Sequence, residues 1–153
     1  MEILGREALE KEAARLAGDL VPHKKGATLI TLSGDLGAGK TAFAQAVAKA
    51  LGVEEMVTSP TFVIEKIYQL PTSDLVGRSF LRLVHIDAYR LSGAHELETL
   101  GWKELLADPK NLILLEWPEK VPEAIPGGAI RIRFDIHGDG RTISIDGEES
   151  TQG

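Results

Sequence analysis

The residues best suited to chemistry form a glycine-rich octapeptide, Gly34-Asp35-Leu36-Gly37-Ala38-Gly39-Lys40-Thr41. It fits the phosphate-loop pattern G-x-x-x-x-G-K-[ST] at every fixed position, between an expected strand at 27–33 and an expected helix at 40–51. Glycines let backbone N–H groups wrap phosphate oxygens, and the helix N-terminus adds its positive end. We therefore expect Lys40 to reach the β- and γ-phosphates as a catalytic charge, and the Thr41 hydroxyl to ligate Mg²⁺. The residues expected to hold the nucleotide are Asp35, Leu36, Gly37, Ala38, Gly39, Lys40, Thr41 and Ala42.

A phosphate loop of this kind needs a carboxylate at the end of a neighbouring strand to hold the magnesium, and two segments offer one. Residues 111–116 form an apolar run typical of a strand buried on both faces, so Glu116 is the predicted metal-side acid, directly or through a water. Its alternative role is to cap a helix or a loop. This acid is therefore the first choice for the metal.

The second acid is Asp87, at the end of a strand that carries Arg82 and His85 and is therefore expected to be half-exposed. Asp87 could position the attacking water or hold a water on the magnesium, or it could only cap the following turn. For His85, a packed or surface side chain is the favoured interpretation over a catalyst.

A third candidate lies in Thr58-Ser59-Pro60-Thr61-Phe62, between the phosphate-loop helix and the next strand. Many P-loop enzymes place a loop that senses the γ-phosphate at this position, and Thr61 is the hydroxyl we select. Read alone, the segment is an ordinary proline turn. No N-K-x-D guanine signature is present, and the D-x-x-G match at 74–77 falls in an expected hairpin turn, so adenine is the favoured base.

The elements that position these residues alternate between strand and helix in the first half and form hairpins later. We expect an α/β, P-loop NTPase-like three-layer fold, with a mixed, mostly parallel central sheet and added antiparallel hairpins. One domain is expected over 1–146, with a flexible tail at 147–153. The expected helices are 6–20, 40–51 and one or two within 95–107; the hairpins pair 62–70 with 79–86 and 129–136 with 141–146; prolines make 118–126 a loop.

Composition narrows the classes of function. The 153 residues hold 17 Lys and Arg against 23 Asp and Glu, a net charge of −6, so binding nucleic acid through a bulk positive field is disfavoured. The absence of cysteine excludes disulfides, thiolate metal sites and a cysteine nucleophile, and suits a reducing compartment. No apolar run is long enough for a bilayer and the first residues lack a signal-peptide pattern, so we expect a cytoplasmic protein without membrane contact.

Four segments stand in a fixed order: GDLGAGKT (34–41), TSPTF (58–62), HIDAYRL (85–91) and LLEWPE (114–119). Together they resemble the small P-loop ATPase family of the bacterial threonylcarbamoyladenosine tRNA-modification system, over roughly residues 26–126. The resemblance implies ATP, Mg²⁺ and hydrolysis in the service of two related, larger subunits, one of which transfers a threonylcarbamoyl group to an adenosine of tRNA. It assigns the family's functional positions to Lys40, Thr41, Thr61, Asp87 and Glu116. The chain departs from the family at Ala88, where leucine is usual, and offers no alignable threonine for the base in its first helix.

Three functions remain in competition: an ATPase subunit that acts on tRNA only indirectly, a small-molecule kinase, and a nucleotide-gated binding module. No arginine among Arg78, Arg82 and Arg90 is placed near the γ-phosphate by its position in the sequence. A P-loop site without such an arginine should turn over slowly alone and need a partner, which favours the first function. We expect the isolated chain to be a monomer.

Overall fold

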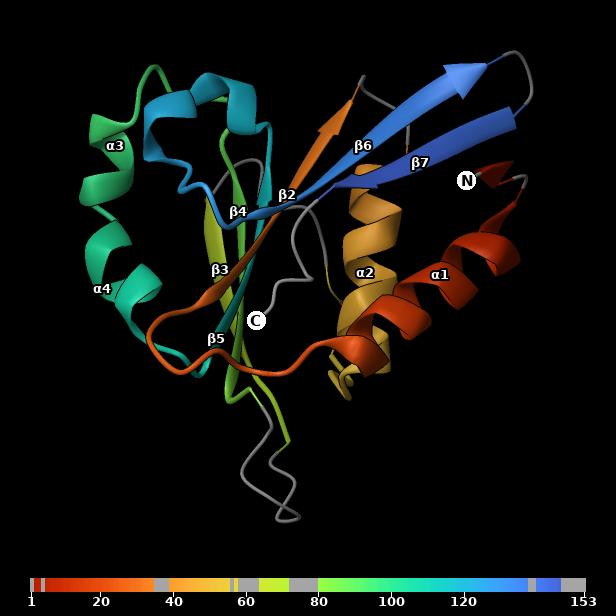
Figure 1. Cartoon of the computed structure of the whole chain (residues 1–153), viewed down its shortest axis with the longest axis horizontal. Helices are drawn as coiled ribbons and strands as arrows, with labels where there is room; N and C mark the ends of the chain where they lie inside the picture. Colours follow the sequence, from red (N-terminus) through yellow and green to blue (C-terminus); the bar gives the residue numbers. More distant parts are fainter. Residues whose placement is uncertain are drawn as a thin grey trace.

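A twisted β-sheet lies between two layers of helices (Figure 1). The computed structural model describes residues 2–3, 5–34, 39–55, 57, 64–71, 80–137 and 140–146. These residues form a seven-stranded sheet in the order β1-β7-β6-β2-β5-β4-β3. The strands are β1 (Glu2–Ile3), β2 (Thr28–Gly34), β3 (Glu65–Gln69), β4 (Arg82–Asp87), β5 (Asn111–Glu116), β6 (Ile130–His137) and β7 (Gly140–Asp146).

The centre of the sheet is parallel and its edges are antiparallel. Strands β4, β5, β2 and β6 are parallel neighbours, whereas β3 pairs antiparallel with β4, and β7 pairs antiparallel with both β6 and β1. Both predicted hairpins and the mixed, mostly parallel sheet are confirmed. The carboxyl ends of β2, β5 and β4 therefore meet at one edge, where ligands bind in open α/β sheets.

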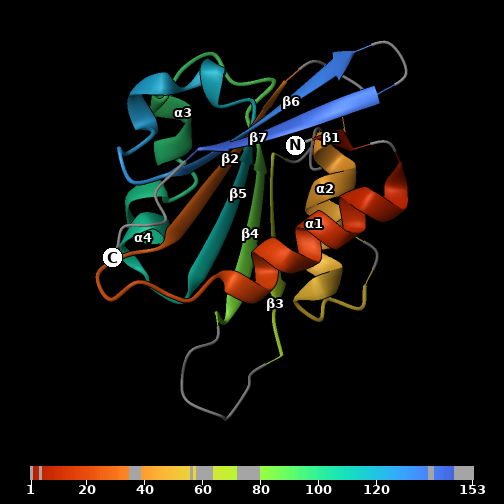
Figure 2. The ribbon, with the colours of Figure 1, turned by 45° about the vertical axis from the view of Figure 1, so that its right-hand side comes forward.

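The helices divide between the two faces of the sheet (Figure 2). Helices α1 (Arg6–Asp19) and α2 (Lys40–Ala50) cover one face, and α3 (His95–Glu98) and α4 (Trp102–Ala107) cover the other. Alternate residues of β4 face opposite cores: Leu83 belongs to the core that contains Phe43 of α2, and Val84 belongs to the core that contains Leu97 of α3. This period-two alternation confirms the three-layer arrangement.

Three details differ from the sequence-based expectation. The strand ending at Asp87 is not half-exposed: five of the six residues of β4 are buried, because the strand lies between β3 and β5 and its two faces pack in the two helix-covered cores. The proline-rich segment forms two short 3₁₀ helices, η1 (Pro118–Lys120) and η2 (Pro122–Ala124). The two-residue strand β1 was not predicted, and the expected tail 147–153 lies outside the described residues.

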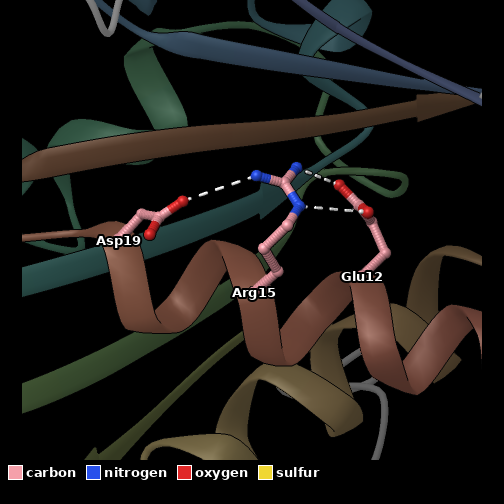
Figure 3. A network of polar contacts seen from close by, with 3 residues as sticks. All are labelled: Glu12, Arg15 and Asp19. Carbon is pink, nitrogen blue, oxygen red and sulfur yellow. Dashed lines mark hydrogen bonds and ion pairs between the residues drawn. The ribbon is translucent and has the colours of Figure 1, made fainter.

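Helix α1 contains a nearly buried carboxylate, Glu12, at 5% exposure. Arg15 lies one turn along the helix and contacts both Glu12 and Asp19, as Figure 3 shows. The hydrogen bond to Glu12 is the main reason that the pKa of Arg15 is raised above its usual value. This pairing satisfies a charge that would otherwise be costly to bury.

The end of β2 requires glycine at position 34. Gly34 has φ +135°, and a Cβ there would overlap the carbonyl oxygen of Phe134 on β6. We expect Gly34→Ala to lower the free energy of unfolding by roughly 2–4 kcal/mol, from backbone strain plus overpacking. Urea unfolding measures this. The matched control is Gly127→Ala, because a Cβ at Gly127 meets nothing within 4 Å; an equal loss in both variants would contradict the explanation.

Candidate active site

Two acids and one lysine gather at the carboxyl edge of the parallel strands. Glu116 lies directly opposite Leu32 of β2 on one side and Asp87 of β4 on the other. Paired residues of neighbouring strands share a face, and Leu32 belongs to the core that packs against α2. Both predicted acids therefore lie on the face covered by the helix whose first residue is Lys40. The parallel pairing of β4 with β5 makes the two acids neighbours although they are far apart in the sequence.

Lys40 is a buried cation at 4% exposure. Its ammonium group donates a hydrogen bond to the carbonyl of Gly34, and its Nζ lies 3.5 Å from the centroid of the Trp117 ring. A cation over an indole face is an attractive arrangement. Lys40 therefore contacts both Gly34, the last residue of β2, and Trp117, the residue that follows β5.

Trp117 is a site residue for which the sequence favoured a place in the core or an interface. Its backbone adopts a left-handed conformation, φ 62° and ψ 53°, which is unusual for a bulky residue. A hydrogen bond from its N–H to the carbonyl of Leu32 (3.1 Å) and a ring contact with Tyr89 (4.9 Å between centroids) hold it there. Its position directly after Glu116 was the available signal for a role in the site.

Glu116 is 2% exposed, and its Oε2 lies 2.7 Å from Nε2 of His85, which is itself 1% exposed. For His85, a packed or surface position was favoured over a catalytic one. It is packed, as expected, but it also contacts the proposed metal-side acid. The apolar run 111–116 correctly indicated a strand buried along its whole length.

Asp87 is 3% exposed, and its Oδ1 accepts a hydrogen bond from the backbone N–H of Tyr89 at 2.9 Å. This is the turn-capping role that the sequence left open. The pairing of β4 with β5 places Asp87 beside Glu116, and a second role for the carboxylate stays a prediction.

The first turn of α2 is shaped to receive an anion. Gly39 precedes the helix with φ 109°, and among the described residues no side chain caps the helix start. The backbone N–H groups of that turn, at Lys40, Thr41 and Ala42, consequently suit phosphate oxygens. The predicted residues Asp35, Leu36, Gly37, Ala38 and Thr61 lie outside the described residues, so their roles stay predictions.

The donor set suits magnesium better than a softer metal. Within the described ranges, no three His, Asp or Glu side chains gather closely enough to hold a metal ion by themselves. A cation here would use carboxylate and hydroxyl oxygens, from Glu116 and Thr41, together with phosphate oxygens. Oxygen donors of this kind are the ones that magnesium prefers.

In the part of the chain that the structure describes, no helix is long and apolar enough to cross a membrane.

Comparison with known proteins identifies the family. A family model described as "Threonylcarbamoyl adenosine biosynthesis protein TsaE" matches residues 7–143. A tRNA threonylcarbamoyladenosine biosynthesis protein TsaE from Streptomyces coelicolor is 43% identical over 108 residues, covering 70% of this chain and 68% of the relative. The protein of the same name from Borreliella burgdorferi is 36% identical over 120 residues, covering 78% and 81%.

A solved structure agrees with this assignment. The crystal structure of YdiB from Bacillus subtilis matches with a TM-score of 0.71 and 29% sequence identity, over 95% of this chain and 82% of that one. The sequence matches and the shared fold extend well beyond the phosphate loop. The chain therefore belongs to the TsaE family of threonylcarbamoyl adenosine biosynthesis proteins.

Proposed function

We propose that this chain binds ATP with Mg²⁺, hydrolyses it slowly, and thereby supports threonylcarbamoyl transfer to an adenosine of tRNA by a complex of two larger subunits. The observation that carries the proposal is the convergence of Lys40, Glu116 and Asp87 at one sheet edge, beside the first turn of α2. In this proposal the partner subunits carry out the transfer, and family membership indicates that the modification is threonylcarbamoyladenosine.

Each residue has a role that follows from its position. Bound MgATP supplies the transferable phosphoryl group and the cation that neutralises its charge. Lys40 and the first N–H groups of α2 bind the phosphate oxygens, and Thr41 and Glu116 hold the magnesium. Asp87 orients the attacking water through its carboxylate. These roles require a phosphate loop closed by residues 35–38, and Thr61 is proposed as the hydroxyl that responds to the γ-phosphate.

The position of Arg82 is consistent with slow turnover by the isolated chain. Arg82 lies at the amino end of β4, where it bonds to Asn111 and Asp108. Asp87 is five residues further along the strand, roughly 16 Å away at the rise of a β-strand. Arg82 is therefore not an arginine finger for this site, which leaves that role to another arginine of the chain or to a partner.

The surplus of acidic residues supports an indirect relation to tRNA. With a net charge of −6, the chain has no bulk field to attract a polyanion, whereas a nucleotide can be held by local N–H groups, Lys40 and a cation. We infer that tRNA is bound by the partner subunits, that the isolated chain is a monomer, and that the complex works in the cytoplasm.

A reconstitution tests the proposal. The chain is combined with the two partner subunits of its own organism, tRNA, threonylcarbamoyl-adenylate and MgATP, and threonylcarbamoyladenosine is measured by mass spectrometry. Repeated rounds of modification should require both this chain and ATP, while the chain alone should hydrolyse ATP well below the ~1 s⁻¹ lower end of ordinary enzymes. Fast hydrolysis without partners, or modification that is independent of the chain, would refute the proposal. Phosphorylation of a small metabolite would favour the kinase alternative.

A further inference from the structure

The function proposed above gives Glu116 a role in holding magnesium but gives none to His85, with which Glu116 forms a buried pair. The two side chains come from neighbouring parallel strands, and His85 lies opposite Leu114, two residues before Glu116. Both point to the α2 face, and their Nε2 and Oε2 atoms are 2.7 Å apart. No other hydrogen bond to the Glu116 carboxylate is found among the described residues.

We propose that His85 is a positioning residue for the magnesium site, which fixes the Glu116 carboxylate by a hydrogen bond from Nε2–H to Oε2. The other carboxylate oxygen is thereby directed to the metal. This inference rests on the proposed function, because it assumes that Glu116 holds magnesium. His85 itself contacts neither metal nor nucleotide.

The direction of the hydrogen bond follows from chemistry. A carboxylate that binds a cation is ionised and can only accept, so the shared proton belongs to Nε2 of the imidazole. A carboxylate at 2% exposure also needs a donor, because water cannot reach it to compensate its burial. His85 meets this need from a strand neighbour, which fixes the side chain of Glu116 in one orientation. Partners of this kind typically change metal affinity by about 10–100-fold when they are removed.

The environment of the other ring nitrogen, Nδ1, indicates that packing alone does not explain a histidine at position 85. Its Nδ1 is buried and has no hydrogen-bond partner among the described residues. Burying a polar atom without a partner is unfavourable, so an apolar side chain of similar volume would pack at lower cost here. Local violations of this kind are expected where function, rather than stability, selects the residue.

Three substitutions separate positioning from packing. His85→Gln carries an amide nitrogen the same number of bonds from Cβ as Nε2 and can still donate to Glu116. His85→Leu fills the volume without a donor, and His85→Asn carries a nitrogen one bond too short. The readout is Mn²⁺ binding to the protein with a non-hydrolysable ATP analogue, followed by electron paramagnetic resonance of free Mn²⁺. Nucleotide affinity without metal and thermal stability are measured in parallel.

We expect His85→Leu and His85→Asn to weaken Mn²⁺ binding by about tenfold or more. His85→Gln should stay within about threefold of the unsubstituted chain, and metal-free nucleotide affinity should change little in any variant. Mn²⁺ affinity unchanged in both His85→Leu and His85→Asn would overturn the inference, as would an equal loss in His85→Gln. If one variant does not fold, the other two still decide. If the unsubstituted chain shows no metal-dependent nucleotide binding, the proposed function fails and this inference with it; if only the variants disagree, the inference alone fails.

Discussion

Lys40→Ala is expected to lower the affinity for MgATP by on the order of 100-fold and to abolish support of threonylcarbamoyl transfer. The loss corresponds to about 3 kcal/mol, the upper range for a hydrogen bond to a charged group. Lys40 is the first residue of α2 and is buried at the edge of the site, over the Trp117 ring. Its positive charge is therefore already held where the phosphates would bind. Calorimetric titration with a non-hydrolysable ATP analogue and Mg²⁺ measures the change.

The matched control is Lys49→Ala, because Lys49 lies in the last turn of the same helix and is exposed. It removes one positive charge from the same element, far from the acids, and should leave nucleotide affinity within about twofold, since exposed charges are largely screened. A thermal melt of both variants separates lost binding from lost folding. If Lys40→Ala and the unsubstituted chain bound MgATP with equal affinity, the proposal that Lys40 binds the phosphates would be wrong.

Short sequence patterns correctly predicted the strand and helix around the phosphate loop and the strand that ends at Glu116. The octapeptide 34–41 and the apolar face of the following residues indicated where β2 ends and α2 begins. The uninterrupted run 111–116 indicated a buried strand, so its residue types alone assign Glu116 to the carboxyl edge of the sheet. Because parallel strands end together at that edge, the same reasoning placed Asp87 near it.

Long-range pairing decided what the sequence could not show. The strand that ends at Asp87 carries polar residues and so resembles an exposed strand, yet both of its faces are covered by the two cores and His85 is hydrogen-bonded to Glu116. Burial of a polar side chain depends on its partner, and this partner is 31 positions away in the chain. No sequence pattern predicts a left-handed tryptophan either, since that backbone is disfavoured for every bulky residue and is imposed here by neighbours.

Asp87→Asn is expected to reduce ATP hydrolysis in the complete complex by about 100-fold or more, the usual loss when a group that manages a proton or a water is removed. Affinity for MgATP should stay within about threefold, because the binding groups described above are unchanged. The amide oxygen of asparagine can still accept the hydrogen bond from the N–H of Tyr89, so the turn after β4 and the thermal stability should be preserved. Hydrolysis is measured as phosphate release, beside binding and melting temperature.

Comparison with Asp87→Ala shows which role of the carboxylate matters. Alanine loses both the charge and the hydrogen bond to the turn, and a lost hydrogen bond of this kind costs about 1 kcal/mol of stability. If Asp87 only caps the turn, Asp87→Asn hydrolyses ATP normally and only Asp87→Ala is impaired. If the chain is a nucleotide-gated binding module, Asp87→Asn stops hydrolysis but leaves repeated threonylcarbamoyl transfer intact. Loss of hydrolysis and of repeated transfer in Asp87→Asn, at unchanged stability and affinity, is the result that only an ATPase subunit produces, because then turnover of the nucleotide is itself the step the partners need.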